Sequence, residues 1–174
     1  MYLHDLNNYC KEFNEVYQIF DNHVDGKNVD KDYLYDSNPD IPVNGDLYKF
    51  PNQKMLIEKR YLYNVDVAFF KKILDKELYK DILYKEQNKK LKIGDYFFTK
   101  YDTIIVYIGN NHNWFHVGKK LLNFLKSLKG KTVTMVGGSS GECFLDLVTT
   151  AKSIGIDVEE NGKYVYSASY CPIK

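Results

Sequence analysis

The stretch KTVTMVGGSSGECFLDLVTTAKSIGIDV, residues 131–158, decides the expected fold. It reads as a short apolar strand over residues 132–136, a glycine- and serine-rich turn over 137–141, and an amphipathic helix over 141–154. Such a strand–turn–helix segment places flexible backbone at a helix N-terminus, where α/β proteins commonly hold ligands. The stretch therefore predicts an α/β fold and the position of a ligand site.

The neighbouring segments continue the alternation of strand and helix. Residues 103–108, TIIVYI, form a continuous apolar run with β-branched side chains, which is typical of a strand buried on both faces. A helix is predicted over residues 117–128 and a last strand over 163–167. This order is a βαβαβ unit, and such units form parallel sheets with right-handed crossovers. We therefore expect a Rossmann-like C-terminal half.

The first half of the chain reads as helix-rich. Apolar residues at steps of three and four predict a helix over residues 3–20 and another from Asn64, as N-cap, to about residue 85. Residues 53–63 and 96–98 are predicted strands. Residues 21–46 contain seven aspartates, but their spacing does not follow a calcium-binding loop, so a solvated acidic loop is expected.

Together these segments predict a single α/β domain over residues 1–174, with a mainly parallel β-sheet flanked by helices. Residues 1–95 would form the helix-rich half and residues 96–174 the βαβαβ half. A chain of 174 residues with 44% hydrophobic content is long and apolar enough to bury a core.

Composition excludes several classes of protein. The net charge is +1 and Arg60 is the only arginine, which argues against sequence-specific nucleic-acid binding. No apolar run is long enough to span a membrane, and the first residues do not resemble a signal peptide. The three cysteines are odd in number and far apart, which favours a reducing compartment. We therefore expect a soluble protein in the cytoplasm of a cell or infected host.

The candidate ligand site lies between two turns. In a parallel sheet the strand-to-helix turns share one edge, so residues 109–116 (GNNHNWFH) and 137–143 (GGSSGEC) should face each other. The expected ligand-binding residues are Gly109, Asn110, Asn111, Gly137, Gly138, Ser139, Ser140 and Gly141. Because Glu142 already satisfies the helix dipole, the turn is a poor phosphate cradle. A small-molecule ligand, with a nucleotide-like one among the alternatives, is expected.

A cysteine nucleophile is the second hypothesis. Cys143 would begin the helix, where the dipole stabilises a thiolate, and His112 or His116 could approach it. The spacing of glycine, serine, cysteine, alanine, glycine and valine resembles the cysteine-bearing segment of isochorismatase-like cysteine hydrolases; these residues are Gly137, Ser140, Cys143, Ala151, Gly155 and Val158. The resemblance covers about 40 residues. It implies that Cys143 is the nucleophile and that backbone N–H groups of its turn form the oxyanion hole.

The alternatives to this chemistry stay open. The family's catalytic aspartate and lysine have no counterpart, and the simpler interpretation is that Cys143 packs in a helix. Catalysis would use Cys143, His112 and Glu142. A metal site formed by His112 and His116 and closed by Glu142 or Cys143 is a further alternative, and no metal or cofactor is assigned. The third hypothesis is a non-catalytic viral or phage accessory protein that binds a partner through its tyrosine-rich first half. A homo-oligomer is compatible with each hypothesis.

Overall fold

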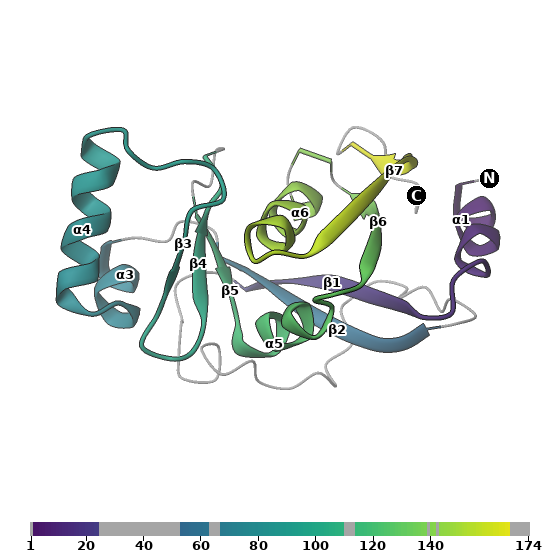
Figure 1. Ribbon diagram of the computed structural model, residues 1–174, viewed down its shortest axis with the longest axis horizontal. Coiled ribbons are helices and arrows are strands. Elements are labelled where there is room, and N and C mark those ends of the chain that lie inside the picture. Colours follow the sequence, from purple (N-terminus) through teal and green to yellow (C-terminus); the bar gives the residue numbers. More distant parts are fainter. Residues whose placement is uncertain are drawn as a thin grey trace.

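The computed structural model describes residues 2–24, 53–62, 67–109, 114–138, 140–141 and 143–167. The elements in these ranges are α1 (Tyr2–Cys10), β1 (Val16–Val24), β2 (Gln53–Leu62), α3 (Val67–Ile73), α4 (Lys76–Gln87), β3 (Tyr96–Phe98), β4 (Ile104–Tyr107), β5 (Trp114–Val117), α5 (Lys119–Ser127), β6 (Thr132–Gly138), α6 (Cys143–Ser153) and β7 (Asp157–Tyr166). Figure 1 shows an elongated molecule with α3 and α4 at one end and α1 at the other.

The described strands pair in three small sheets instead of one. β1 and β2 are parallel, β6 and β7 are parallel, and β3, β4 and β5 form an antiparallel sheet in that order. The expected mainly parallel, Rossmann-like sheet is therefore wrong. The strand predicted over residues 103–108, β4, is antiparallel to both of its neighbours.

The error lies in residues 114–117, WFHV, which form strand β5 where a turn was expected. All four residues are buried, and Tyr107 and Ile104 of β4 pair with Trp114 and Val117. Only residues 108–113 separate the two strands. A parallel crossover needs a dozen or more residues, so this short connection allows only a hairpin.

The secondary structure predicted for residues 131–158 is largely confirmed. β6 and β7 pair in parallel, with Val133 opposite Val158, and α6 connects them. The predicted helix over residues 117–128 is α5, and the predicted strands over 53–63 and 96–98 are β2 and β3.

Two helix predictions in the first half are wrong. The helix expected over residues 3–20 ends at Cys10, because the β-branched and aromatic residues after it form β1. The helix expected to run to residue 85 is interrupted by Asp75, whose carboxylate accepts a hydrogen bond from the Leu78 backbone N–H (2.9 Å) and begins α4. Its expected N-cap, Asn64, and residues 25–46 of the acidic loop lie outside the described residues.

The core consists of two apolar layers, one on each face of the antiparallel sheet. Toward α5 and α6 the strands contribute Ile104, Val106, Phe115 and Val117. Toward α3 and α4 they contribute Ile105 and Trp114, which pack with Ile73, Leu74 and Ile82. Strand alternation therefore places successive residues of β4 and β5 in different layers. Within the described ranges no helix is long and apolar enough to cross a membrane.

Candidate functional site

An open pocket of ≈ 450 Å³ lies where α3, α4 and the turn between β3 and β4 meet. This volume is in the range of small-molecule sites. We call it the lysine pocket after the residues that line it, which are Lys71, Leu74, Lys76, Tyr79, Lys80 and Lys100. Four of these six side chains carry a positive charge in a protein whose net charge is only +1.

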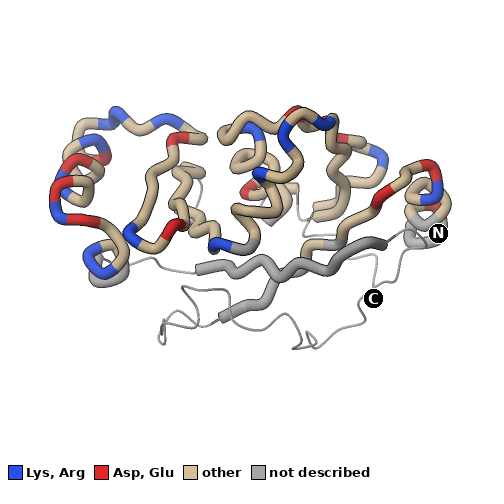
Figure 2. The backbone as a smooth tube through the Cα atoms, turned by 60° about the horizontal axis from the view of Figure 1, so that its bottom comes forward, with Lys and Arg blue, Asp and Glu red and all other residues tan. Residues whose placement is uncertain are grey.

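Three segments bring the four lysines together. Lys71 lies in the last turn of α3, and Lys76 and Lys80 are one turn apart on the same side of α4. Lys100 follows β3, and its backbone N–H donates to the carbonyl oxygen of Ile73 at 2.8 Å. This bond holds the β3–β4 turn against the end of α3. Figure 2 shows basic residues on both helices at this end of the molecule.

The floor of the lysine pocket is apolar. Leu74 is almost fully buried, and the Nζ atom of Lys71 lies 5.9 Å from the centroid of the Tyr79 ring, within reach of a cation–π contact. Lys80 forms an ion pair with Glu77, with Nζ and Oε1 3.9 Å apart, and both side chains are largely exposed, so this pair neutralises little charge. The pocket therefore combines surplus positive charge with an apolar surface.

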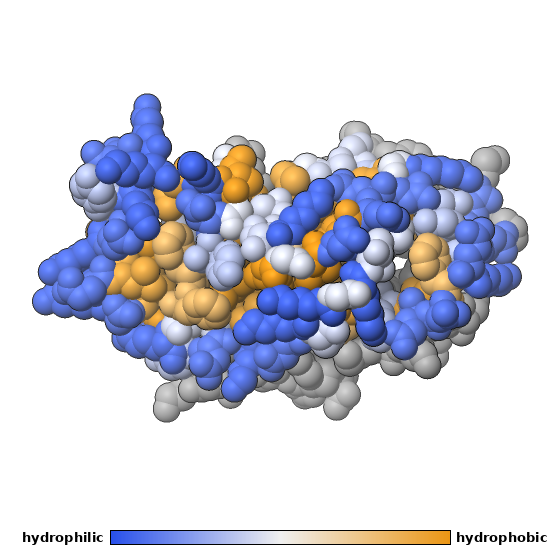
Figure 3. All heavy atoms as spheres, viewed as in Figure 1, coloured by the Kyte–Doolittle hydropathy of each residue, from blue (hydrophilic) through white to orange (hydrophobic). Residues whose placement is uncertain are grey.

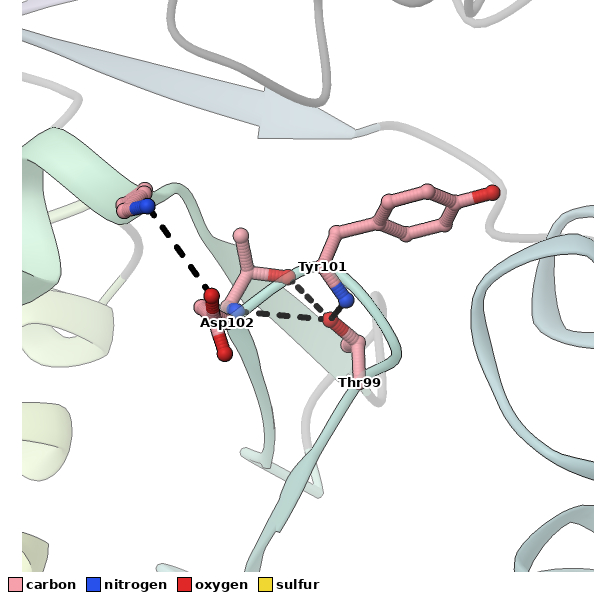
Figure 4. A network of polar contacts seen from close by, with 5 residues as sticks. Thr99, Tyr101 and Asp102 are labelled. Carbon is pink, nitrogen blue, oxygen red and sulfur yellow. Dashed lines mark hydrogen bonds and ion pairs between the residues drawn. The ribbon is translucent and has the colours of Figure 1, made fainter.

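The turn that carries Lys100 is fixed by threonine side chains (Figure 4). The Oγ1 atom of Thr99 accepts hydrogen bonds from the backbone N–H groups of Tyr101 (3.2 Å) and Thr103 (3.3 Å). It also lies 2.6 Å from Oγ1 of Thr103. Asp102 has a positive φ of 58°, and its carboxylate is 3.9 Å from Nζ of Lys119 in α5.

A buried histidine completes this network. Nε2 of His116 lies 2.9 Å from Oγ1 of Thr103. Both acceptor positions of the Thr99 hydroxyl are used by N–H groups, so its hydrogen points to Thr103 and the Thr103 hydroxyl donates to His116. Burial lowers the pKa of His116 to about 4, so the ring is neutral at pH 7 and accepts this hydrogen bond. His116 therefore supports the turn under the lysine pocket.

The structure describes only part of the predicted two-turn site. Asn110, Asn111, His112, Ser139 and Glu142 lie outside the described residues. Gly109, Gly137, Gly138, Ser140 and Gly141 lie inside them, and Cys143 is the first residue of α6. The backbone N–H of Ser140 donates to the carbonyl oxygen of Tyr166 (2.8 Å), which ties the turn to β7.

The topological reason for joining the two turns is lost with the parallel sheet. A Cβ atom added to Gly109 would lie 3.2 Å from the side chain of Ile93. The residue after Ile93 is Gly94, and a Cβ atom added there would lie 2.7 Å from the side chain of Ser153 at the end of α6. The turn over residues 137–141 instead precedes the beginning of α6. A pocket between the two turns stays a prediction.

Of the histidines considered for a metal site, the structure describes only His116. Its Nε2 atom is engaged by Thr103 inside the molecule. In the ranges that the structure describes, no three histidine, cysteine, aspartate or glutamate side chains are close enough to hold a metal ion.

The two cysteines with described backbone differ in their expected reactivity. Cys10 is buried beside Leu6 and Tyr164, and burial raises the pKa of its thiol. Cys143 begins α6, as the nucleophile hypothesis requires. If that hypothesis is right, iodoacetamide should alkylate Cys143 at least about tenfold faster than Cys10 at pH 7.5, because only the thiolate reacts. Peptide mass spectrometry at several times measures both rates, and equal slow labelling would contradict a nucleophilic Cys143.

No family model, curated protein or solved structure matches this chain. The resemblance of residues around Cys143 to isochorismatase-like cysteine hydrolases therefore stays a prediction. The functional assignment has to come from the geometry of the site.

The sequence did not predict the lysine pocket. Lys71, Lys76 and Lys80 are exposed, and their spacing alone is typical of the solvated face of a helix. Nothing in the order of residues shows that Lys100 joins them, because its position depends on the antiparallel hairpin and on the bond to Ile73. The one available signal was the density of lysines around residues 71–80.

Proposed function

We propose that this protein binds a small phosphate-bearing molecule in the lysine pocket. One observation carries the proposal: four lysines from three separate segments surround one pocket with an apolar floor. Lysine binds phosphate as a mobile point charge, and Leu74 and Tyr79 offer a surface for an apolar part of the ligand.

Binding is proposed instead of catalysis because of what lines the pocket. Its lining residues are four lysines, a leucine and a tyrosine, and the described lining includes no carboxylate, imidazole or thiol to activate a lysine or the tyrosine. This proposal keeps the expected class, a small-molecule-binding protein, and moves the site from the two glycine turns to the other end of the antiparallel sheet.

Removal of two pocket lysines should weaken phosphate binding by about tenfold or more, since each lysine offers a charge-assisted hydrogen bond. The test is isothermal titration calorimetry at pH 7.5 and low salt, with tripolyphosphate and a nucleoside triphosphate as probes. The pocket variant is Lys76→Gln/Lys100→Gln. The matched control is Lys129→Gln/Lys131→Gln, which removes two exposed lysines outside the pocket.

The control separates a site from general attraction to a charged surface. We expect the control variant to bind within about twofold of the wild type, whereas general attraction would weaken both variants equally. Equal weakening, or no binding of either probe to the wild type at millimolar concentration, would contradict the proposal.

A further inference from the structure

Exposed apolar side chains gather at one edge of the antiparallel sheet. Of the large hydrophobic residues exposed in the described ranges, Ile93, Tyr96 and Phe98 fall within six positions of one another, and Phe98 is 57% exposed. Tyr96 and Phe98 lie on the same face of β3, opposite Val106 and Ile104 of β4, and their rings are in edge contact at 5.9 Å. They extend the apolar layer beyond the last strand. Figure 3 shows apolar side chains gathered on the side of the molecule where β3 lies.

Among the residues that the structure describes, no strand pairs with the outer side of β3. The backbone N–H of Tyr107 donates to the carbonyl oxygen of Asp95, and the backbone N–H of Thr99 donates to the carbonyl oxygen of Thr103. The two residues of each pair lie directly opposite each other at the ends of β3 and β4. Hydrogen-bonded pairs alternate along an antiparallel ladder, so Phe97 and Ile105 form the next such pair. The N–H and C=O groups of Tyr96 and Phe98 therefore point away from β4. β3 is also the terminal strand of its sheet.

We propose that β3 pairs with β3 of a second copy of this chain, antiparallel and about a two-fold axis at Phe97. In this register Tyr96 lies opposite Phe98 of the other copy, and the two residues exchange both of their free backbone hydrogen bonds. The pairing joins two three-stranded sheets into one. It is isologous, so it closes at a dimer and leaves no further edge at β3.

Side chains at the seam agree with this register. Tyr96 and Phe98 of opposite copies become cross-strand neighbours, and aromatic pairs of this kind stabilise antiparallel strands. Asp95 precedes β3 and Lys100 follows it by two residues. In the antiparallel register Asp95 lies opposite Thr99 of the other copy and one position from its Lys100, whereas parallel pairing would set like charges together.

The seam is short, so the dimer belongs to the weak class of assemblies. Sedimentation equilibrium of the whole chain between roughly 1 and 500 µM should show a reversible dimer with a micromolar dissociation constant. Two variants test the seam. Phe98→Asp replaces a seam aromatic by a charge, and Tyr96→Pro removes an outward N–H that the protein's own sheet does not use.

The matched control is Tyr84→Asp, which replaces an aromatic residue of similar exposure (52%) in α4. We expect both seam variants to weaken dimerisation at least about tenfold and the control to leave it unchanged. Circular dichroism of each variant shows whether it is folded. Phe98→Asp changes a side chain at the seam and Tyr96→Pro removes a backbone N–H, so the test can be made with either variant if the other does not fold. A wild type that stays monomeric throughout, or a dimer that both folded seam variants preserve, would overturn the proposal, as would a complex formed only with an unrelated protein.

Discussion

The free energy of unfolding should fall by about 3 kcal/mol between pH 7 and pH 4 through His116 alone. Burial holds the pKa of His116 at about 4 in the folded protein, against the ordinary value of 6.5. Between these two values the unfolded chain binds more protons than the folded one. The contribution is therefore complete above pH 6.5 and is lost as the pH falls toward 4. Urea unfolding at a series of pH values measures it.

The variant His116→Gln isolates this effect. Glutamine keeps a polar group that can reach Thr103 but does not titrate. Carboxylates titrate in both proteins, so the difference between the two pH profiles reports on His116. We expect the difference in stability between wild type and variant to shrink by about 3 kcal/mol from pH 7 to pH 4. Parallel profiles over this range would show that the imidazole is not buried as a neutral ring.

The same network links the core to the proposed binding site. His116 supports Thr103, Thr103 bonds to Thr99, and the turn between the two threonines carries Lys100. The position of Lys100 therefore depends on the hydrogen bonds between Thr99, Thr103 and His116. The last of these side chains lies in the apolar layer between the sheet and helices α3 and α4. The phosphate titrations are placed at pH 7.5 because His116 is neutral there and the turn is intact.

Local patterns in the sequence predicted individual elements better than their arrangement. The apolar run of β4, the strand–turn–helix of β6 and α6, and the stripe of α5 are all visible in residue order, because each depends on neighbours within a few positions. Whether β4 pairs in parallel or antiparallel depends on β5. The sequence of β5, WFHV, is too short to show whether its apolar residues repeat with the period of a strand or of a helix. A four-residue strand next to an asparagine-rich turn was therefore interpreted as part of that turn.

The first half shows how tertiary pairing overrides a helical pattern. Residues 16 to 20 continue the three-and-four spacing of α1, but Val16 and Ile19 are β-branched and pair with the distant strand β2. The site was harder still to predict. The lysine pocket forms because the helix break at Asp75 and the turn after Thr99, which are distant in sequence, lie side by side in the fold.

Gly94→Ala should destabilise the protein by about 3 kcal/mol, clearly more than Gly130→Ala, which should cost about 1 kcal/mol. Both glycines have a positive φ, 92° and 84°, so both substitutions introduce backbone strain. Only Gly94 faces a neighbour: an added Cβ would lie 2.7 Å from Oγ of Ser153, whereas nothing lies within 4 Å at Gly130. Urea unfolding of the two variants gives the difference.

A double-mutant cycle with Ser153→Ala separates crowding from strain. The Ser153 hydroxyl donates to the carbonyl oxygen of Thr149 (2.7 Å) and is held toward Gly94. In the Ser153→Ala background, Gly94→Ala should cost no more than Gly130→Ala, which corresponds to a coupling of about 2 kcal/mol. Equal costs for the two glycine variants in the wild-type background would mean that the segment before β3 does not pack on the end of α6. That contact sets the segment before β3 against the end of α6, so the cycle tests the arrangement that replaced the parallel sheet.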